Sequence, residues 1–486
     1  GSEMCIRDST YYMVSTTMHF MPGCEILQSF DLVHWEHVTY VYETLDHTDA
    51  QQLKSGQNIY GQGMWAASLC YHEGRFYICF VANDTRKTYL YTSEKIDGPW
   101  KKQLIEGFYH DGSLLFDEDG RNYIVYGNDE IWITELNEDL TAPKKDGLHR
   151  LLVSDHKNPE LGYEGSHIQK INGYYYIFLI HSLRDRWMRT EACFYSDSLE
   201  GEFTGGDVLC DDRGYCGQGV AQGGIVDTPD GKWYAMLFQD SGAVGRIPIL
   251  LPVTWKDHFP FFGQNGHVPE EIEVHSTRPG YIYQPLVGSD DFCNGLLPRW
   301  QFNHDPDPRY YHLDALQGTY TITTREVCTE LTQAVNTLTQ RMSYPSCAAE
   351  VTVDASALKE GDVAGLCALQ SCYAAVGITK HHGKYEVLML DKKEDGILDM
   401  TEGTVVESHQ MDFRLEADFC NMKDEARCYY RVNKGDWLPI GTVHKLYFKL
   451  DHFTGCRFGL FCYAAEETGG SACFRDFKYY DVDEIS

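Results

Sequence analysis

One short strand pattern recurs five times before residue 240, and it constrains the fold more than any other feature of the sequence. Each copy has Tyr at its second position followed by apolar residues: YYMV at 11–14, FYIC at 76–79, NYIV at 122–125, YYIF at 175–178 and WYAM at 233–236. The successive Tyr residues are 65, 46, 53 and 58 positions apart. Repeats of about 40 to 50 residues with several short strands each are typical of propeller blades, and insertions lengthen some of them. The sequence therefore predicts a five-bladed β-propeller.

The pattern changes after residue 287. A segment rich in Gly, Pro and Glu runs from 264 to 287, and it is followed by short alternating runs such as AEVTV at 349–353 and YEVLML at 385–390. Regular polar turns separate these runs, which is typical of a β-sandwich. We therefore expect an all-β chain with a propeller over 1–287 and a sandwich over 288–486.

The composition limits the kinds of molecule that we expect this chain to bind. The formal net charge of −31 repels phosphate backbones and anionic lipid surfaces, so we expect neither a nucleic acid nor a membrane as partner. The chain contains 33 Tyr, 23 Phe and 9 Trp, and aromatic faces pack well against sugar rings as well as within sheets. A neutral carbohydrate is compatible with both features.

The cysteines favour a reducing compartment. The 17 cysteines are scattered, and they lack both paired C-x-x-C spacing and the framework of a small secreted domain. No apolar stretch is long enough to span a membrane, and no signal-peptide core precedes the first repeat. These features predict a cytoplasmic protein and leave the oligomeric state open.

Two acidic residues occupy equivalent places in successive repeats. Asp111, in HDGSLL at 110–115, and Glu164, in EGSHI at 164–168, each precede a Gly-Ser pair and then apolar residues. Strands that line a propeller channel deliver their side chains to one mouth. A single acid of this kind would more often belong to a structural turn, but two matching placements favour a functional site.

At this point the sequence resembles glycoside hydrolase family 43. The resemblance is carried in the propeller by WAASL at 65–69, HDGS at 110–113, EGSH at 164–167 and GIVDTPDGKWY at 224–234. In the second domain it is carried by SDDF at 289–292, PRWQFNH at 298–304 and NTLTQR at 336–341. It implies a five-bladed propeller followed by a concanavalin A-like jelly roll. It also implies an exo-acting β-xylosidase or α-L-arabinofuranosidase that releases pentoses from xylo- or arabinoxylo-oligosaccharides with inversion.

The resemblance assigns roles to the two acids. Glu164 matches the general acid, which must be protonated near neutral pH and so needs a raised pKa. Asp111 matches a third carboxylate that orients the acid and keeps its pKa up. Inversion needs the acid and the general base roughly 6.5–9.5 Å apart, which leaves room for the attacking water.

Four further residues match substrate-binding positions of the family. Trp65 matches the floor of the sugar pocket, Arg246 an arginine that binds sugar hydroxyls, and Phe20 an aromatic pocket wall. Gln222 stands where family members often carry a histidine linked to a bound cation. The resemblance therefore predicts that no cofactor is required, and this glutamine argues against a structural calcium ion.

The general base is the largest departure from the family pattern. It should be an aspartate in an Asp-Pro-Ser segment about ten residues before Tyr11, a count that reaches Gly1. Residues 2–9 contain no such motif and do not read as an apolar inner strand. We therefore expect the first blade to lack its inner strand and the base to be absent. General-base catalysis is typically worth about 10²–10⁴ in rate, so hydrolysis should be weak.

Other functions remain open at this stage. A carbohydrate-binding propeller without turnover fits the missing base, and an interaction propeller fits the repeats alone. A retaining, invertase-like enzyme would need an N-terminal Asn-Asp-Pro segment, which the sequence does not contain. Xylose and arabinose are not distinguished. The loop before Trp65 and any sandwich side chain that reaches the pocket, with 336–341 as a candidate stretch, would decide between them.

Overall fold

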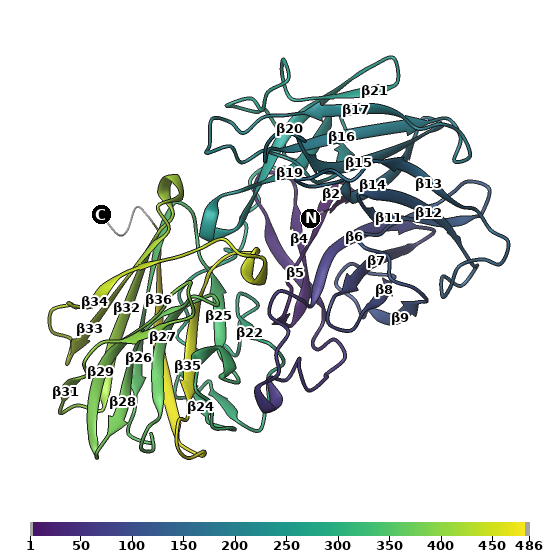
Figure 1. Ribbon diagram of the computed structural model, residues 1–486. Helices are drawn as coiled ribbons and strands as arrows, with labels where there is room; N and C mark the ends of the chain where they lie inside the picture. The colour runs from purple at the N-terminus through teal and green to yellow at the C-terminus, as the bar shows by residue number, and fades with distance from the viewer. Residues whose placement is uncertain (1–2, 482–486) are drawn as a thin grey trace.

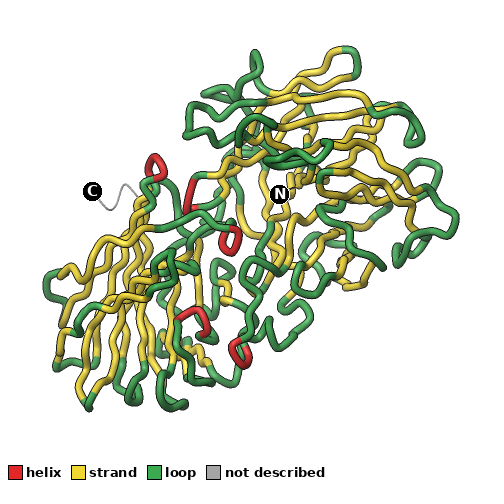
Figure 2. Tube along the Cα trace, in the orientation of Figure 1, coloured by secondary structure: helices red, strands yellow, loops and turns green. Residues whose placement is uncertain are grey.

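The protein consists of two β-rich bodies packed side by side, a propeller and a sandwich (Figure 1). The structure, a computed structural model, describes residues 3–481. Strands dominate both bodies (Figure 2), and the helices within the described range are single 3₁₀ turns. These turns are η1 (Lys54–Gly56), η2 (Gly242–Val244), η3 (Leu331–Gln333), η4 (Cys420–Met422) and η5 (Leu450–His452). The predicted all-β fold is confirmed.

The propeller has five four-stranded antiparallel blades. Blade 1 contains β1 (Glu3–Arg7), β2 (Thr10–Ser15), β4 (Gly23–Ser29) and β5 (Glu36–Tyr42). Blade 2 contains β6 (Met64–His72), β7 (Arg75–Ala82), β8 (Lys87–Ser93) and β9 (Lys101–Ile105). Blade 3 contains β10 (Ser113–Phe116), β11 (Asn122–Asn128), β12 (Glu130–Leu136) and β13 (His149–Ser154). Blade 4 contains β14 (Glu164–Ile171), β15 (Tyr174–Ser182), β16 (Arg189–Ser196) and β17 (Thr204–Leu209). Blade 5 contains β18 (Ile225–Asp227), β19 (Trp233–Asp240), β20 (Arg246–Lys256) and β21 (Phe259–Phe262).

The five sequence repeats are the second strands of the five blades. In blades 2 to 5 a turn glycine with φ between 79° and 84° links the first strand to the second, at Gly74, Gly120, Gly173 and Gly231. Nothing lies within 4 Å of a Cβ built at these positions, so the backbone conformation rather than space calls for glycine. The repeat therefore marks a hairpin whose first strand lies next to the channel.

The first blade is complete. β1 pairs with β2 from Glu3 opposite Val14 to Arg7 opposite Thr10, and it contacts β6 of blade 2 and β18 of blade 5. The prediction that this blade lacks its inner strand is therefore wrong. The strand forms through hairpin pairing with β2 and contacts with both neighbouring blades. Gly1, the position expected for the general base, lies outside the described residues.

The sandwich packs two antiparallel sheets face to face over one apolar core. The nine-stranded sheet contains β22 (Gln301–Asn303), β25 (Leu338–Arg341), β35 (Arg457–Tyr463), β27 (Val363–Leu369), β28 (Ala374–His381), β29 (Lys384–Lys392), β30 (Leu398–Met400), β31 (Thr404–Val406) and the propeller strand β3 (Phe20–Met21). The seven-stranded sheet contains β23 (Tyr311–Asp314), β24 (Thr319–Thr323), β36 (Ser471–Asp481), β26 (Ser346–Asp354), β32 (Gln410–Asp418), β33 (Glu425–Val432) and β34 (Leu438–Lys445).

The two bodies are joined by backbone pairing as well as by side chains. β3, a short strand of the first repeat, pairs with β22 of the sandwich, with Met21 opposite Phe302. The segment between β21 and β22 also runs back against blade 1, where the Thr277 amide donates to Phe30 O at 2.8 Å. The predicted boundary at 287/288 falls within this segment. Because one sheet crosses the boundary, the sandwich is held in a fixed place beside the propeller mouth.

Candidate active site

Three side chains from blades 3 and 4 meet at one mouth of the propeller channel. Glu164 is the first residue of β14, and Asp111 lies two residues before β10. His110 Nε2 lies 3.3 Å from Asp111 Oδ2 and 3.4 Å from Glu164 Oε2. One ligand-type atom from each residue lies within 4.8 Å of the others. The structure thus brings the two predicted acids together and adds a histidine between them. We call these three residues the acid cluster.

The opposite charges of His110 and Asp111 stabilise each other. Burial alone would lower the pKa of His110, but the charges of Asp111 and Glu164 raise it to about 10. Burial would likewise raise the pKa of Asp111, but His110 and the Gly165 amide lower it to about 2. An imidazolium therefore faces an ionised Asp111 at neutral pH. The side chain of Glu164 is 24% exposed, against 5% for Asp111, so Glu164 is the carboxyl open to a ligand.

The Asp-Gly-Ser and Glu-Gly-Ser stretches hold this geometry through backbone contacts. Asp111 has a left-handed backbone with φ 49°, and its Oδ2 accepts a 2.8 Å bond from the Gly165 amide. Ser166 Oγ donates to Asp111 O at 2.7 Å. A Cβ at Gly165 would lie 2.7 Å from the Gln222 side chain, and φ there is 64°. Glycine is favoured here because the backbone is left-handed and a side chain would meet Gln222.

A second charged cluster flanks the first. Asp240, at the end of β19, is 5% exposed and forms ion pairs with two arginines. One is with Arg189 Nη1, and the other is with Arg246 Nε at 3.3 Å. Arg246 opens β20, so a hairpin brings it opposite Asp240. Burial lowers the pKa of Arg246 to about 10, while the charges of Glu164 and Asp111 raise it, which places this guanidinium within electrostatic range of the acid cluster.

The sandwich contributes an aromatic side chain to the same mouth. Phe453 follows η5, and its ring centroid lies 5.1 Å from that of Trp65 in an edge-to-face arrangement. The Arg246 guanidinium lies 4.4 Å from the Phe453 centroid and 4.3 Å from that of Phe238. Trp65, in β6, and Arg246 are therefore linked through one ring from the second domain. Two aromatic faces and a guanidinium are what a sugar ring and its hydroxyls require.

Gln222 lies below the acid cluster in the channel. It is 4% exposed and lines a narrow space of about 10 Å³ together with Asp111 and Gly165. Its backbone amide donates at 2.7 Å to Oε2 of Glu191, a fully buried residue whose pKa burial raises well above the ordinary value. Because Gln222 packs beside Asp111, it supports the floor of the channel. A direct contact of Gln222 with substrate stays a prediction.

Phe20 does not line the pocket. It is fully buried in β3, where it packs in the interface with the sandwich. The guanidinium of Arg457 lies 3.7 Å from its ring centroid. The prediction of a pocket wall is therefore wrong, because β3 turns away from the channel to pair with β22. The family pattern identified the position of Phe20 in the sequence. Pairing of β3 with the second domain determines which way its side chain points.

The acid cluster is the one group of metal-ligand type that emerges among residues 3–481. A cation bound there would have to displace the proton of His110. A histidine must be neutral to bind a metal, whereas His110 is held protonated by its two carboxylate neighbours. The absence of a required cofactor stays a prediction.

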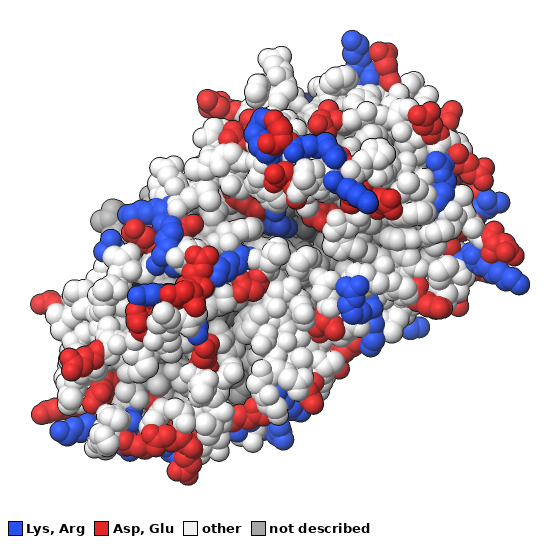
Figure 3. Space-filling model, in the orientation of Figure 1, with Lys and Arg blue, Asp and Glu red and all other residues white. Residues whose placement is uncertain are grey.

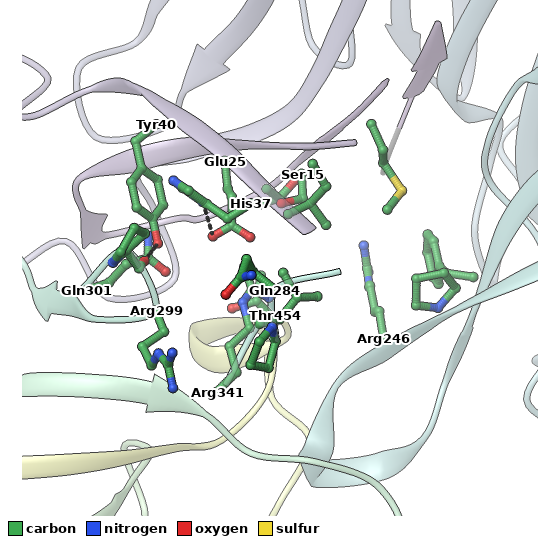
Figure 4. A pocket seen from close by; sticks show the side chains of 18 of the residues that line it. Ser15, Glu25, His37, Tyr40, Arg246, Gln284, Arg299, Gln301, Arg341 and Thr454 are labelled. Atoms are coloured by element: carbon green, nitrogen blue, oxygen red, sulfur yellow. Dashed lines mark hydrogen bonds and ion pairs between the residues drawn. The ribbon is translucent and has the colours of Figure 1, made fainter. Parts of the chain in front are cut away.

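A cavity of about 450 Å³ lies between blade 1, blade 5 and the sandwich. Arg246 lines one end, and Tyr40, Gln301 and Arg299 lie at the other (Figure 4). The surface is hollowed along the boundary between the bodies, and Lys or Arg side chains are visible inside the hollow (Figure 3). Arg341, the last residue of the predicted 336–341 stretch, reaches this cavity. Asn336 is instead buried and binds the backbone of Asp307.

Sequence reasoning missed His110, Arg189, Asp240 and Phe453. His110 is the first residue of the HDGS motif, and its position directly before Asp111 could have identified it as a site residue. Arg189, Asp240 and Phe453 carry no local motif, because their role comes from contacts between elements distant in the sequence.

Comparison with known proteins gives concordant matches. The family model of glycosyl hydrolases family 43 matches residues 2–260, and that of the β-xylosidase C-terminal concanavalin A-like domain matches residues 289–480. A β-xylosidase of Formosa agariphila is 26% identical, with 98% of this chain and 86% of that protein covered. A non-reducing end α-L-arabinofuranosidase of Bacteroides ovatus is 22% identical, with 82% and 77% covered.

A solved structure extends the comparison to the fold. A bifunctional GH43-CE protein of Bacteroides eggerthii is 41% identical with a TM-score of 0.91. The match covers 99% of this chain and 62% of that chain, so this chain spans less than two thirds of that relative. Across the described residues no helix has the length and apolar character needed to cross a membrane.

Proposed function

The chain belongs to glycosyl hydrolase family 43, and on that premise we propose that it is built as an exo-acting, inverting glycosidase. Its substrates would be xylo- or arabinoxylo-oligosaccharides that end in β-D-xylose or α-L-arabinofuranose. The observation that carries the proposal is the acid cluster, where Glu164 is the more accessible carboxyl and lies within electrostatic range of Arg246, which contacts the Phe453 ring. Relatives named as a β-xylosidase and an α-L-arabinofuranosidase support the substrate class.

In the proposed reaction Glu164 supplies the proton. Its carboxyl group protonates the glycosidic oxygen as the bond from that oxygen to the anomeric carbon breaks. A water on the opposite face of the sugar attacks the anomeric carbon and loses its proton to a general base. The products are the free pentose with inverted configuration and the shortened oligosaccharide. Glu164 is left ionised and takes up a proton from solvent.

Asp111 and His110 position the acid. His110 Nε2 lies 3.3 Å from Asp111 Oδ2 and 3.4 Å from Glu164 Oε2, so it bridges the two carboxyl groups. Because His110 contacts both carboxyls, it fixes their separation. Arg246 and Phe453 would bind the terminal sugar, the arginine through its hydroxyls and the ring through its C–H face.

The general base is the part that this chain does not supply at the family position. Gly1 stands where the aspartate is expected, and it lies outside the described residues. We therefore propose that the chain hydrolyses pentosides slowly. The substitutions Gly1→Asp, Ser2→Pro and Glu3→Ser create the family segment, and we call the triple variant the base-restored variant. General-base catalysis predicts a gain of about 10²–10⁴ in rate.

The test compares 4-nitrophenyl β-D-xyloside and α-L-arabinofuranoside as substrates. We expect slow release of 4-nitrophenol by the parent chain, fast release by the base-restored variant, and a partial loss of that gain when Glu164→Gln is added, because 4-nitrophenol leaves without full protonation. Hydrolysis at ordinary enzyme rates by the parent chain would refute the missing base. The substrate with the higher kcat/KM identifies the preferred pentose.

A carbohydrate-binding protein without turnover is the second candidate, and Gly1 at the base position is the observation that favours it. It predicts that xylotriose binds with equal affinity to the parent chain and to the base-restored variant, and that neither hydrolyses it. Calorimetric titration at constant pH separates the two functions, because binding followed by reaction heat indicates the enzyme.

A further inference from the structure

The 450 Å³ cavity between the propeller and the sandwich has an unbalanced charge on its sandwich side. Arg341 and Arg457 face each other as cross-strand partners in β25 and β35. Arg457 is 1% exposed, and its Nη1 donates to Gln301 Oε1 at 2.8 Å. Its Nε and Nη2, and Nη2 of Arg341, are buried without a hydrogen-bond partner among the described residues. Of these two arginines, Arg341 lines the cavity, and Arg457 lies behind it as its cross-strand partner.

Carboxylates in the wall do not compensate these cations. The cavity lining contains Arg246, Arg299 and Arg341 but, of the acidic residues that the structure describes, only Glu25. Glu25 is 7% exposed, and its Oε2 lies 3.7 Å from His37 Nδ1 (Figure 4). Burial would raise the pKa of Glu25, but His37 and Arg341 lower it. One ionised carboxylate thus faces two adjacent guanidinium groups.

The excess positive charge has an energetic consequence. Burial, with the like charge of Arg341, lowers the pKa of Arg457 to about 9. Keeping a guanidinium ionised in a buried place costs free energy unless an anion pairs with it. Arginine presents a planar fork that matches a carboxylate with two parallel hydrogen bonds. Glu25, Gln301 and the Phe20 ring offset part of this cost at Arg457, and a carboxylate bound at Arg341 would offset more of it for the pair.

The size and lining of the cavity fit a substituted sugar. A volume of 450 Å³ lies within the range of about 300–1,000 Å³ usual for small-molecule sites. Apolar side chains of Met13, Leu27, Pro285, Leu286 and Leu297 form much of the wall. Arg246 closes the end nearest the acid cluster. A group held at Arg341 could therefore belong to a molecule whose other end lies at the active site.

We propose that this cavity is a binding site for a carboxylate-bearing ligand, with Arg341 as its main charge partner. The carboxylate has two sources of the same chemistry: a uronic acid substituent on the pentose oligosaccharide, or a free small carboxylate. The first source rests on the proposed function, and the second does not. Arg299, at the rim, donates to Ser289 O at 3.3 Å and adds positive charge at the entrance.

The test is calorimetric titration of the full chain, which measures binding without turnover. The ligands are D-glucuronate, acetate and neutral D-xylose, together with xylotriose and xylotriose carrying a glucuronic acid. We expect D-glucuronate to bind and Arg341→Gln to weaken that binding by about tenfold to a hundredfold, the loss typical of a charged hydrogen bond. Arg341→Lys should recover part of the affinity, because it restores charge but not the planar fork. Arg427→Gln, on the exposed β33 far from the cavity lining, is the matched control and should change nothing.

The outcomes separate the two sources. Tighter binding of the acidic xylotriose than of plain xylotriose, lost in Arg341→Gln, assigns the carboxylate to the substrate. Equal binding of acetate and D-glucuronate, again lost in Arg341→Gln, assigns it to a free carboxylate. No carboxylate binding by the parent chain, or unchanged binding by Arg341→Gln, overturns the proposal. If the base-restored variant bound carboxylates but did not hydrolyse pentosides, the proposed function would be refuted and the carboxylate site would stand.

Discussion

The acid cluster and the interface cavity differ in how their charges are compensated. At the channel mouth every charge faces an opposite one: His110 lies between Asp111 and Glu164, and Asp240 pairs with two arginines. At the cavity, Arg341 and Arg457 share the single carboxylate of Glu25. The acid cluster lies on blades 3 and 4 and the cavity lies against blades 1 and 5, and Arg246 lies between the two regions. The difference indicates a preorganised reaction site in one region and a site completed by a ligand in the other.

This contrast predicts different responses to substitution. Removing a member of a balanced buried cluster leaves an uncompensated charge, which is costly. Removing one of two arginines that share a single carboxylate should cost less, because the remaining arginine keeps Glu25 as its counter-charge.

The largest effect should come from Glu164. In the base-restored variant, Glu164→Gln removes the proton donor, and we expect kcat to fall by about 10²–10⁴ on xylobiose, whose leaving group needs protonation. A smaller loss is expected on 4-nitrophenyl xyloside, which leaves without full protonation. Glu160→Gln, exposed in the preceding loop, is the control. An equal loss on both substrates would contradict the role of Glu164 as acid.

The next effect should come from Asp240. Asp240→Asn leaves Arg189 and Arg246 without their shared counter-charge, and we expect the free energy of unfolding to fall by about 3–5 kcal/mol. Urea denaturation measures this change. Asp185→Asn, which removes a surface pair with Arg186, should cost less than about 1 kcal/mol. Equal costs for the two variants would mean that the buried cluster is not balanced as described.

Phe453 should affect substrate binding across the domain boundary. Phe453→Ala removes the ring that contacts Trp65 and lies under Arg246. We expect KM to rise by about threefold to thirtyfold with a smaller change in kcat, because a ring contact and a cation–π contact are lost. Phe453→Leu keeps most of the apolar volume, so its KM should lie between that of the protein with Phe453 and that of Phe453→Ala. A change confined to kcat would place Phe453 outside sugar binding.

The acid cluster should give stability a specific pH dependence. The pKa of His110 is raised from 6.5 to about 10, so its stabilising contribution is complete below pH 6.5 and is lost as pH rises through about 10. The pKa of Asp111 is lowered from 3.8 to about 2, so its contribution is present above pH 3.8 and is lost as pH falls through about 2. The difference in unfolding free energy between the parent chain and His110→Gln should therefore shrink between pH 6.5 and 10. A constant difference over that range would contradict the contacts of His110.

The smallest effect should come from the cavity. Without added ligand, Arg341→Gln should leave the free energy of unfolding within about 0.5 kcal/mol of the parent value, or raise it. Urea denaturation in the absence of carboxylate buffers measures this. A loss of about 2 kcal/mol or more would show that Arg341 is already paired in the protein and would remove the contrast between the two regions.

Sequence alone predicts the parts of this architecture that rest on local pattern. The Tyr repeat marks the second strand of each blade, and the Gly-Ser pairs after Asp111 and Glu164 mark the turns that bring the two acids together. Trp65 and Arg246 follow from family motifs at fixed offsets from those strands. These features depend on hairpin geometry, which residues close in sequence determine.

The remaining features depend on contacts between distant segments. Phe453 reaches the mouth only because the sandwich packs against it, and Arg341 meets Arg457 only through sheet pairing. Phe20 was misplaced because β3 joins the sandwich sheet. The inner strand β1 was not predicted because residues 2–9 lack the family's Asp-Pro-Ser motif, although residues 4–6 are apolar. No local pattern encodes these arrangements.

The anomeric form of the released sugar tests whether the chain is built as an inverting glycosidase with Glu164 as its acid. Proton NMR would follow 4-nitrophenyl β-D-xyloside with the base-restored variant, before the sugar anomers equilibrate. Inversion by Glu164 and a base on the opposite face predicts α-D-xylose as the first product. β-D-xylose as the first product would contradict the account, and so would a base-restored variant no faster than the parent chain.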